Sequence, residues 1–234
     1  MLPLKDNVPT RTFPAVTVGL IVANVLVWLW EVSGTPVNQD VVDYGYYPCA
    51  VGSTCIGPAR DHLPLVEMVF TSMFMHASWI HIGGNMLFLW IFGNNVEDAL
   101  GKARFLAWYL AAGVAATVVQ SFVTLSFGTA QDASVPNIGA SGAIAGVLGA
   151  YFLLLPRASV LTAIFLGFFF FLQEIPAMFY LGIWFLFQLW QGGFALVQPQ
   201  AGGGVAFFAH VGGFAFGLLT VNLVKQRQPL RPRY

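Results

Sequence analysis

The chain has 234 residues, of which 57% are hydrophobic and 9% are charged, and its formal net charge at pH 7 is zero. A soluble domain usually carries about 25% charged residues. The low charge and a mean hydropathy of +0.73 therefore exclude an ordinary soluble domain. Without excess positive charge, a nucleic-acid partner is not expected. We predict an all-α membrane protein that crosses the bilayer several times.

Six apolar windows approach or exceed the roughly 17–25 residues that a bilayer core requires. They predict membrane-spanning helices at about 14–32, 80–96, 104–126, 138–155, 176–192 and 205–224. The chain then divides into a cytoplasmic N-terminal segment (1–13), a six-span domain (14–224) and a basic cytoplasmic tail (225–234). Residues 1–12 also fit the n-region of a signal peptide, but the lack of a clear cleavage site favours a first span that is retained.

Two connections between the spans are unusual. Residues 33–79 are rich in proline and glycine and too long for a turn, which predicts an ordered extramembrane loop. Cys49 and Cys55 both fall in this loop, and the pattern leaves open whether they form a disulfide. Residues 158–175 are apolar, but their uncharged core is short for a crossing, and Gln173, Glu174 and Pro176 interrupt it. We expect an interfacial or re-entrant segment that leads into the fifth span.

The basic residues predict the orientation in the membrane. With the N-terminus on the cytoplasmic side, nine of the ten Lys and Arg residues fall on that side, and Arg60 falls outside. The reverse orientation would violate the positive-inside rule. We therefore predict an integral multi-pass protein of the cell (inner) membrane, with both termini in the cytoplasm.

Ser141 and His210 are polar residues in apolar spans, where the bilayer penalises polar side chains. Ser141 begins the predicted fourth span, and His210 lies near the outer end of the sixth. One span separates these helices, so they run in the same direction and bring both residues toward the external surface. The structural alternatives are small-residue packing for Ser141 and a hydrogen-bonding or proton-relay role for His210. We predict a Ser–His dyad with His210 as general base and then general acid.

His81 and Asn85 are spaced i and i+4 on the predicted second span and therefore share one face. They either hydrogen-bond to a neighbouring helix or supply the donors of an oxyanion hole near Ser141. The nearby His76 is expected to be structural. The sequence has no His-Glu-x-x-His pattern and no Asp in a predicted span, which argues against a zinc site and an aspartyl dyad. The remaining acidic residues lie at span edges or in loops, so we predict no carboxylate to complete a triad, and no metal or cofactor.

Three motifs resemble those of the rhomboid family of intramembrane serine proteases, and the similarity covers roughly residues 65–224. Gly139-Ala140-Ser141-Gly142 is similar to the family's nucleophile motif, Ala209 to Phe214 to its histidine motif, and His81 to Asn85 to its second-span motif. The resemblance implies a six-transmembrane-helix bundle with a long first external loop, a catalytic pair of Ser141 and His210, and oxyanion roles for His81 and Asn85. It also implies single-span membrane protein substrates, entry beside the fifth span, and a mobile loop over the site at about 193–204.

Two positions depart from the family pattern. Glu67-Met68 stands where many members carry Trp-Arg, and Ala145 stands where some members stack a Tyr on the catalytic histidine. Another group must therefore orient His210. A catalytically silent relative that binds membrane clients and a transporter that uses the polar residues are the alternatives, and the presence of both dyad residues favours a protease. The sequence does not predict an oligomeric state.

Overall fold

The computed structural model describes residues 1–34, 37–61, 63–167, 169–197 and 206–226. Its long helices are α1 (Ala15–Ser33), α4 (Trp79–Phe88), α6 (Lys102–Phe127), α8 (Ser141–Leu154), α9 (Ala177–Val197) and α10 (Phe207–Val224). A π-helical turn (Leu89–Gly93) joins α4 to α5 (Asn94–Leu100). Helices thus occupy all six predicted spans. Among the described residues, α1, α6 and α10 are long and apolar enough to cross a membrane, and α8 is a shorter apolar helix. The chain is a membrane protein, and six crossings remain a prediction.

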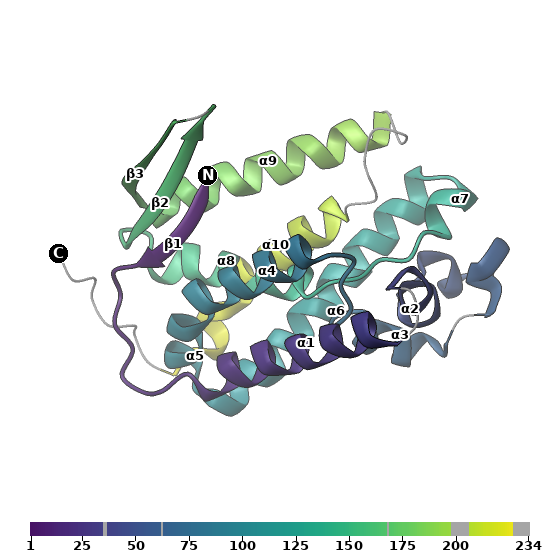
Figure 1. Cartoon of the computed structure of the whole chain (residues 1–234), viewed down its shortest axis with the longest axis horizontal. Helices are drawn as coiled ribbons and strands as arrows, with labels where there is room; N and C mark the ends of the chain where they lie inside the picture. The colour runs from purple at the N-terminus through teal and green to yellow at the C-terminus, as the bar shows by residue number, and fades with distance from the viewer. Residues whose placement is uncertain (35–36, 62, 168, 198–205, 227–234) are drawn as a thin grey trace.

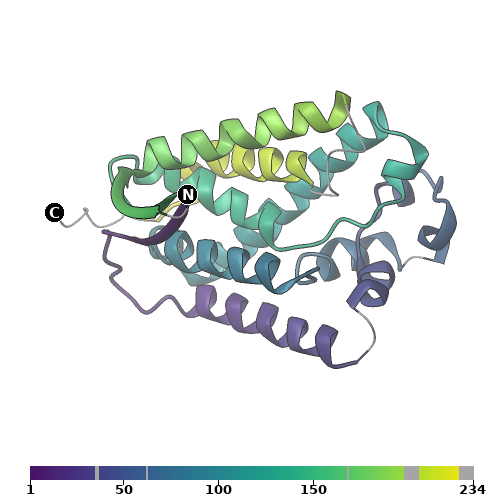
Figure 2. The ribbon, with the colours of Figure 1, turned by 45° about the horizontal axis from the view of Figure 1, so that its top comes forward.

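Helix α8 lies inside the bundle, and every residue from Gly142 to Tyr151 is buried. Helices α1 and α9 form opposite outer sides of the bundle (Figure 1, Figure 2). Helix α10 packs so closely on α8 that a Cβ atom at Gly217 would overlap the backbone of Gly146. Glycines permit this approach because they leave no side chain between the two helix backbones. The approach places the N-terminal turns of α8 and α10 side by side.

The segment between α1 and α4 is folded and lies at one end of the bundle (Figure 1). It contains α2 (Val37–Tyr44), 3-10 turns at Pro48–Val51 and Gly57–Asp61, and α3 (Leu65–Thr71), and it packs beside α7 (Ala130–Ala133). Its own hydrophobic cluster includes Tyr47 and Met68. Cys49 and Cys55 form a disulfide, which answers the question that the sequence left open. The extramembrane location of this segment remains a prediction.

A three-stranded antiparallel sheet at the other end of the bundle corrects the expectation of an all-α fold (Figure 1). Its strands are β1 (Leu2–Asp6), β2 (Ser159–Leu166) and β3 (Phe169–Pro176), in the order β1-β2-β3. The apolar run at 158–175 is therefore a β-hairpin. Half of the residues in β2 and β3 are β-branched or aromatic, which favours strands, and Gly167 adopts a left-handed φ of +60° at the turn. Hydropathy alone does not distinguish such a hairpin from the interfacial or re-entrant segment that we expected.

Two buried carboxylates fasten α1 to the rest of the molecule. Glu97 accepts hydrogen bonds from the backbone N–H groups of Val16 and Thr17 at 3.1 and 2.7 Å, where the positive end of the α1 dipole favours a negative charge. At the other end of α1, the carboxylate of Glu31 accepts from the backbone N–H of His76 at 3.2 Å. Helix α1 therefore braces the segment that enters α4.

Helix α9 extends further than the sequence predicted. The mobile loop was expected at about 193–204, but the helix continues through Gly192 and Gly193 to Val197. Gly192 lies against Phe207 and Phe208, so the glycine allows close packing with the start of α10 and does not end the helix. The prediction of a loop is wrong for residues 193–197, and residues 198–204 lie outside the described part of the chain.

Candidate active site

Ser141 is the first residue of α8. The segment before it is fixed by backbone hydrogen bonds: Asn137 and Tyr46 pair in both directions at 2.8 and 3.0 Å, and the N–H of Gly139 donates to the carbonyl of Ser72 at 2.8 Å. No side chain caps the start of α8. The N–H groups of its first turn, which have no intrahelical acceptor, therefore lie next to the Ser141 hydroxyl.

His210 lies in the first turn of α10, and its Nε2 atom is 2.8 Å from Oγ of Ser141. The start of α10 is held against α6 because the backbone N–H of Ala209 donates to Oε1 of Gln120 at 3.1 Å. The structure thus brings together the two residues that the sequence pairs as a dyad. Their contact joins the N-terminal turns of two parallel helices.

Gln188 and Trp184 of α9 also contact His210, and neither contact was predicted from the sequence. Oε1 of Gln188 lies 2.8 Å from Nδ1 of His210, and the Trp184 ring centroid lies 5.8 Å from that of the imidazole, with the planes tilted by 39°. Their i and i+4 spacing places both on one face of α9. The sequence did contain a signal for Gln188, because an amide in the middle of a predicted span requires a hydrogen-bonding partner.

His81 and Asn85 of α4 face the backbone that precedes Ser141. The φ of Gly139 is +114°, and a Cβ atom there would lie 2.8 Å from Nε2 of His81 and 3.6 Å from Nδ2 of Asn85. Gly139 is therefore required both for its backbone conformation and for space beside these two side chains. The structure places the predicted oxyanion donors beside the nucleophile motif.

His76 holds Asn85 in this orientation. Nδ1 of His76 lies 3.1 Å from the carbonyl oxygen of Phe74, and its Nε2 lies 3.0 Å from Nδ2 of Asn85. Burial, with a smaller contribution from the nearby His81, lowers the pKa of His76 to about 4. His76 is therefore neutral at pH 7, with Nδ1–H donating to Phe74 and Nε2 accepting from Asn85. These contacts agree with the structural role expected for His76.

A cavity of about 530 Å³ connects these groups. Its walls come from α4, α8, α9, the start of α10 and the segment at 136–138, and they include Ser141, His210, His81, Asn85 and Gln188. The volume lies within the range of about 300–1,000 Å³ that is usual for ligand pockets. Both dyad residues and both predicted oxyanion donors therefore border one space.

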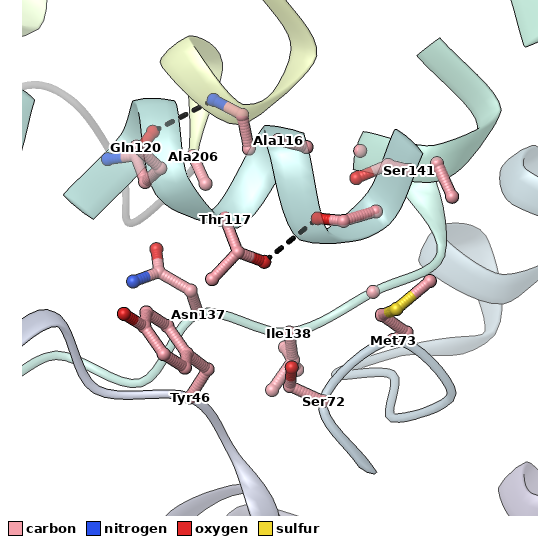
Figure 3. A pocket seen from close by; sticks show the side chains of 15 residues that line it. Tyr46, Ser72, Met73, Ala116, Thr117, Gln120, Asn137, Ile138, Ser141 and Ala206 are labelled. Atoms are coloured by element: carbon pink, nitrogen blue, oxygen red, sulfur yellow. Dashed lines mark hydrogen bonds between the residues drawn. The ribbon is translucent and has the colours of Figure 1, made fainter. Parts of the chain in front are cut away.

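A smaller cavity of about 40 Å³ lies on another side of Ser141. Figure 3 shows Thr117 of α6 facing Asn137 and Ile138 across it, and Gln120 directed toward the start of α10. A space of this size holds about one water molecule, and its polar lining can hydrogen-bond to one. Within the part of the chain that the structure describes, no group of three or more His, Cys, Asp or Glu residues has a metal-binding arrangement.

Comparison with known proteins identifies a Rhomboid domain at residues 66–227. The human presenilin-associated rhomboid-like protein, mitochondrial, is 31% identical over 224 residues, which are 91% of this chain and 50% of that protein. Rhomboid protein 1, mitochondrial, of Saccharomyces cerevisiae is 30% identical over 72% of this chain and 46% of its own length. Rhomboid protease GluP of Bacillus subtilis is 40% identical over 35% of this chain and 14% of its own length. The chain spans about half the length of the first two relatives.

Proposed function

We propose that this chain, which belongs to the rhomboid family, is an intramembrane serine endopeptidase. The observation that carries the proposal is the 2.8 Å contact between Ser141 Oγ and His210 Nε2 in a bundle of apolar helices. A hydroxyl next to an imidazole nitrogen is the arrangement that nucleophilic catalysis requires. The substrates would be single-span membrane proteins, cleaved in or near the bilayer.

The first chemical step uses the hydrogen bond of the dyad. The Ser141 hydroxyl donates to the unprotonated Nε2 of His210, which accepts the proton as Ser141 Oγ attacks the scissile carbonyl carbon. The tetrahedral intermediate collapses as the C–N bond breaks, and His210 returns the proton to the leaving amine. This leaves an ester between Ser141 and the substrate acyl group.

The negative charge of the tetrahedral intermediate would be stabilised by His81 and Asn85. His76 occupies one N–H of the Asn85 amide, and the second is free to donate to the oxyanion. The N–H groups at the start of α8 add the positive end of a helix dipole. One such donor is typically worth about 2.7–4 kcal/mol of transition-state stabilisation.

Hydrolysis of the ester requires water, which is scarce in an apolar bundle. The small cavity lined by Thr117 and Gln120 has room for about one water molecule beside Ser141. From this cavity the water would move past Ser141 to the ester beside His210. His210 would remove a proton from the water as its oxygen attacks the ester carbonyl, and the same proton then goes to the Ser141 oxygen. The cycle ends with the free serine and a neutral imidazole.

The larger cavity supports entry of the substrate from the side. Its walls include Phe88 of α4 and Trp184 of α9, so a chain that moves between these helices would reach the dyad. We also propose that the protein crosses the cell (inner) membrane six times, with both termini in the cytoplasm and the site toward the external face. In this proposal the six-span domain extends from residue 14 to residue 224, and residues 158–175 lie in the membrane interface.

A reconstituted cleavage assay with a single-span substrate tests the proposal. Ser141→Ala and His210→Ala should each reduce cleavage by at least about 10³-fold, because each removes one half of the dyad. Ser126→Ala is the matched control, since this exposed serine at the end of α6 contacts neither cavity. A serine-directed fluorophosphonate should label the wild type and Ser126→Ala, but not Ser141→Ala. Binding of the substrate without cleavage or labelling would instead indicate a silent client-binding relative.

A further inference from the structure

We infer that Gln188 is a positioning residue that holds His210 in the one neutral tautomer able to accept the serine proton. The inference rests on the proposed function for its catalytic meaning. The contact itself is a property of the fold: Oε1 of Gln188 lies 2.8 Å from Nδ1 of His210. It supplies the orienting group that the absence of a ring at Ala145 leaves undefined.

The two nitrogens of a neutral imidazole have opposite roles, because one carries the proton and the other accepts. The amide oxygen of Gln188 has no proton to donate, so the 2.8 Å contact requires the proton on Nδ1 of His210. Nε2 is then unprotonated and faces Oγ of Ser141 at the same distance. With the other tautomer, Nε2 would carry a proton and could not remove one from Ser141.

The location of Gln188 explains why this residue is an amide. It is 7% exposed, near the middle of α9, and about 17 Å along the helix from the first residue, Ala177. A carboxylate at such a depth would carry a large desolvation cost unless it were fully paired. A glutamine presents the same acceptor oxygen without a charge. Gln188 thus fits a site that has to orient histidine inside an apolar bundle.

Trp184 acts with Gln188 to restrict the imidazole. Its ring lies one helical turn before Gln188 and contacts His210 on the same side of α9. Gln188 fixes which nitrogen is protonated, and Trp184 limits rotation of the ring. Both groups come from α9, whereas the nucleophile comes from α8 and the histidine from α10. The arrangement therefore depends on three helices that are brought together only by tertiary packing.

The first test compares Gln188→Leu, which removes the acceptor, with Gln188→Glu, which retains it. Loss of one hydrogen bond and of the tautomer preference should lower kcat by about 10- to 100-fold in Gln188→Leu, with KM changed less than about twofold. Gln188→Glu should keep most of the activity, and the acid limb of its pH profile should move to higher pH because a carboxylate favours the imidazolium form. Gln191→Leu is the control, as another glutamine of α9 that is not part of the cavity wall.

Two kinetic results would overturn the assignment. Wild-type kcat in Gln188→Leu would show that the acceptor is dispensable. The second result is that Gln188→Leu and Gln188→Glu lose kcat equally and have the same thermal midpoint, which is lower than that of the wild type. This would show that Gln188 acts through packing alone.

A spectroscopic test separates this inference from the proposed protease activity. The ¹⁵N chemical shifts of histidine distinguish the protonated ring nitrogen from the unprotonated one, and His210→Ala assigns the signal. The wild type should show His210 protonated at Nδ1, and Gln188→Leu should shift population toward the Nε2-protonated form. A wild-type His210 protonated at Nε2 would overturn the inference. This result is obtained whether or not the protein cleaves a substrate, so failure of the proposed function remains distinguishable.

Discussion

Gly217 offers a direct test of whether the approach of α10 to α8 sets the distance within the dyad. A methyl group at position 217 would overlap the Gly146 carbonyl and lie 2.8 Å from its carbon atom. Carbon atoms in favourable contact are about 3.5–4.0 Å apart, so Gly217→Ala should push the two backbones apart by roughly 1 Å. Relief by a side-chain rotamer is not available, because the clash is with the backbone.

The displacement should affect both catalysis and stability. Moving α10 by roughly 1 Å would lengthen the 2.8 Å contact between Ser141 and His210 beyond hydrogen-bonding distance. A misplacement of this size can cost about 100-fold in rate. Overpacking should lower the free energy of unfolding by about 1–3 kcal/mol. Gly217 is about 10 Å along α10 from His210, so the methyl group itself does not reach the substrate.

The assay measures cleavage of a reconstituted single-span substrate, together with the thermal unfolding midpoint. Gly19→Ala in α1 is the matched control, because a Cβ atom at Gly19 meets nothing within 4 Å. It should retain wild-type cleavage. Equal cleavage by Gly217→Ala and Gly19→Ala would refute the argument that backbone contact between α8 and α10 determines the geometry of the dyad.

Three further perturbations test other parts of the molecule. Replacing Cys49 and Cys55 with serine should lower the free energy of unfolding by about 2 kcal/mol, because the disulfide closes a short loop; an unchanged thermal midpoint would contradict this. Burial raises the pKa of Asp6 to about 6 from its ordinary value of 3.8, so its contribution to stability is fully present below about pH 4 and is lost as the pH rises through about 6. Asp6→Asn should therefore raise the thermal midpoint at pH 8 and change it little at pH 4, and the opposite pattern would refute the sign. A spin label on Phe170→Cys should collide more with oxygen than with a water-soluble nickel complex if the hairpin lies in the membrane interface. The label on Val51→Cys should collide more with the nickel complex. A preference for nickel at both sites would place the hairpin in water.

The contact between Ser141 and His210 was easier to predict from the sequence than the structure around it. Ser141 and His210 were identifiable because polar groups are costly in a bilayer, and counting the helices showed that both lie near one surface. His81 and Asn85 followed from their spacing on one face. Gln188 is also a polar residue in an apolar span. Its partner lies on another helix, however, and the spacing of residues within α9 does not reveal that partner.

The fold was predictable where one local pattern determines the structure. Helical spans follow from long apolar runs, and helices occupy all six predicted positions. The hairpin at 158–175 was not recognised, because hydropathy measures transfer from water and does not distinguish a lipid-facing helix from an apolar pair of strands. Gly192 and Gly193 likewise suggested a loop, but both lie inside α9, and Gly192 leaves room there for the ring of Phe208.

The pairing of β1 with β2 also has a consequence for how the chain folds. Asp6 is opposite Val160, so strand β1 is synthesised long before its partner exists. At about 5–20 residues per second, β1 waits on the order of 10 s for residues 159–166. Such a distant contact forms slowly, because the entropy of closing a long loop opposes it. Strand β1 therefore cannot pair before α8 and β2 have been synthesised, and an unpaired β1 would mark chains that have not yet reached the hairpin.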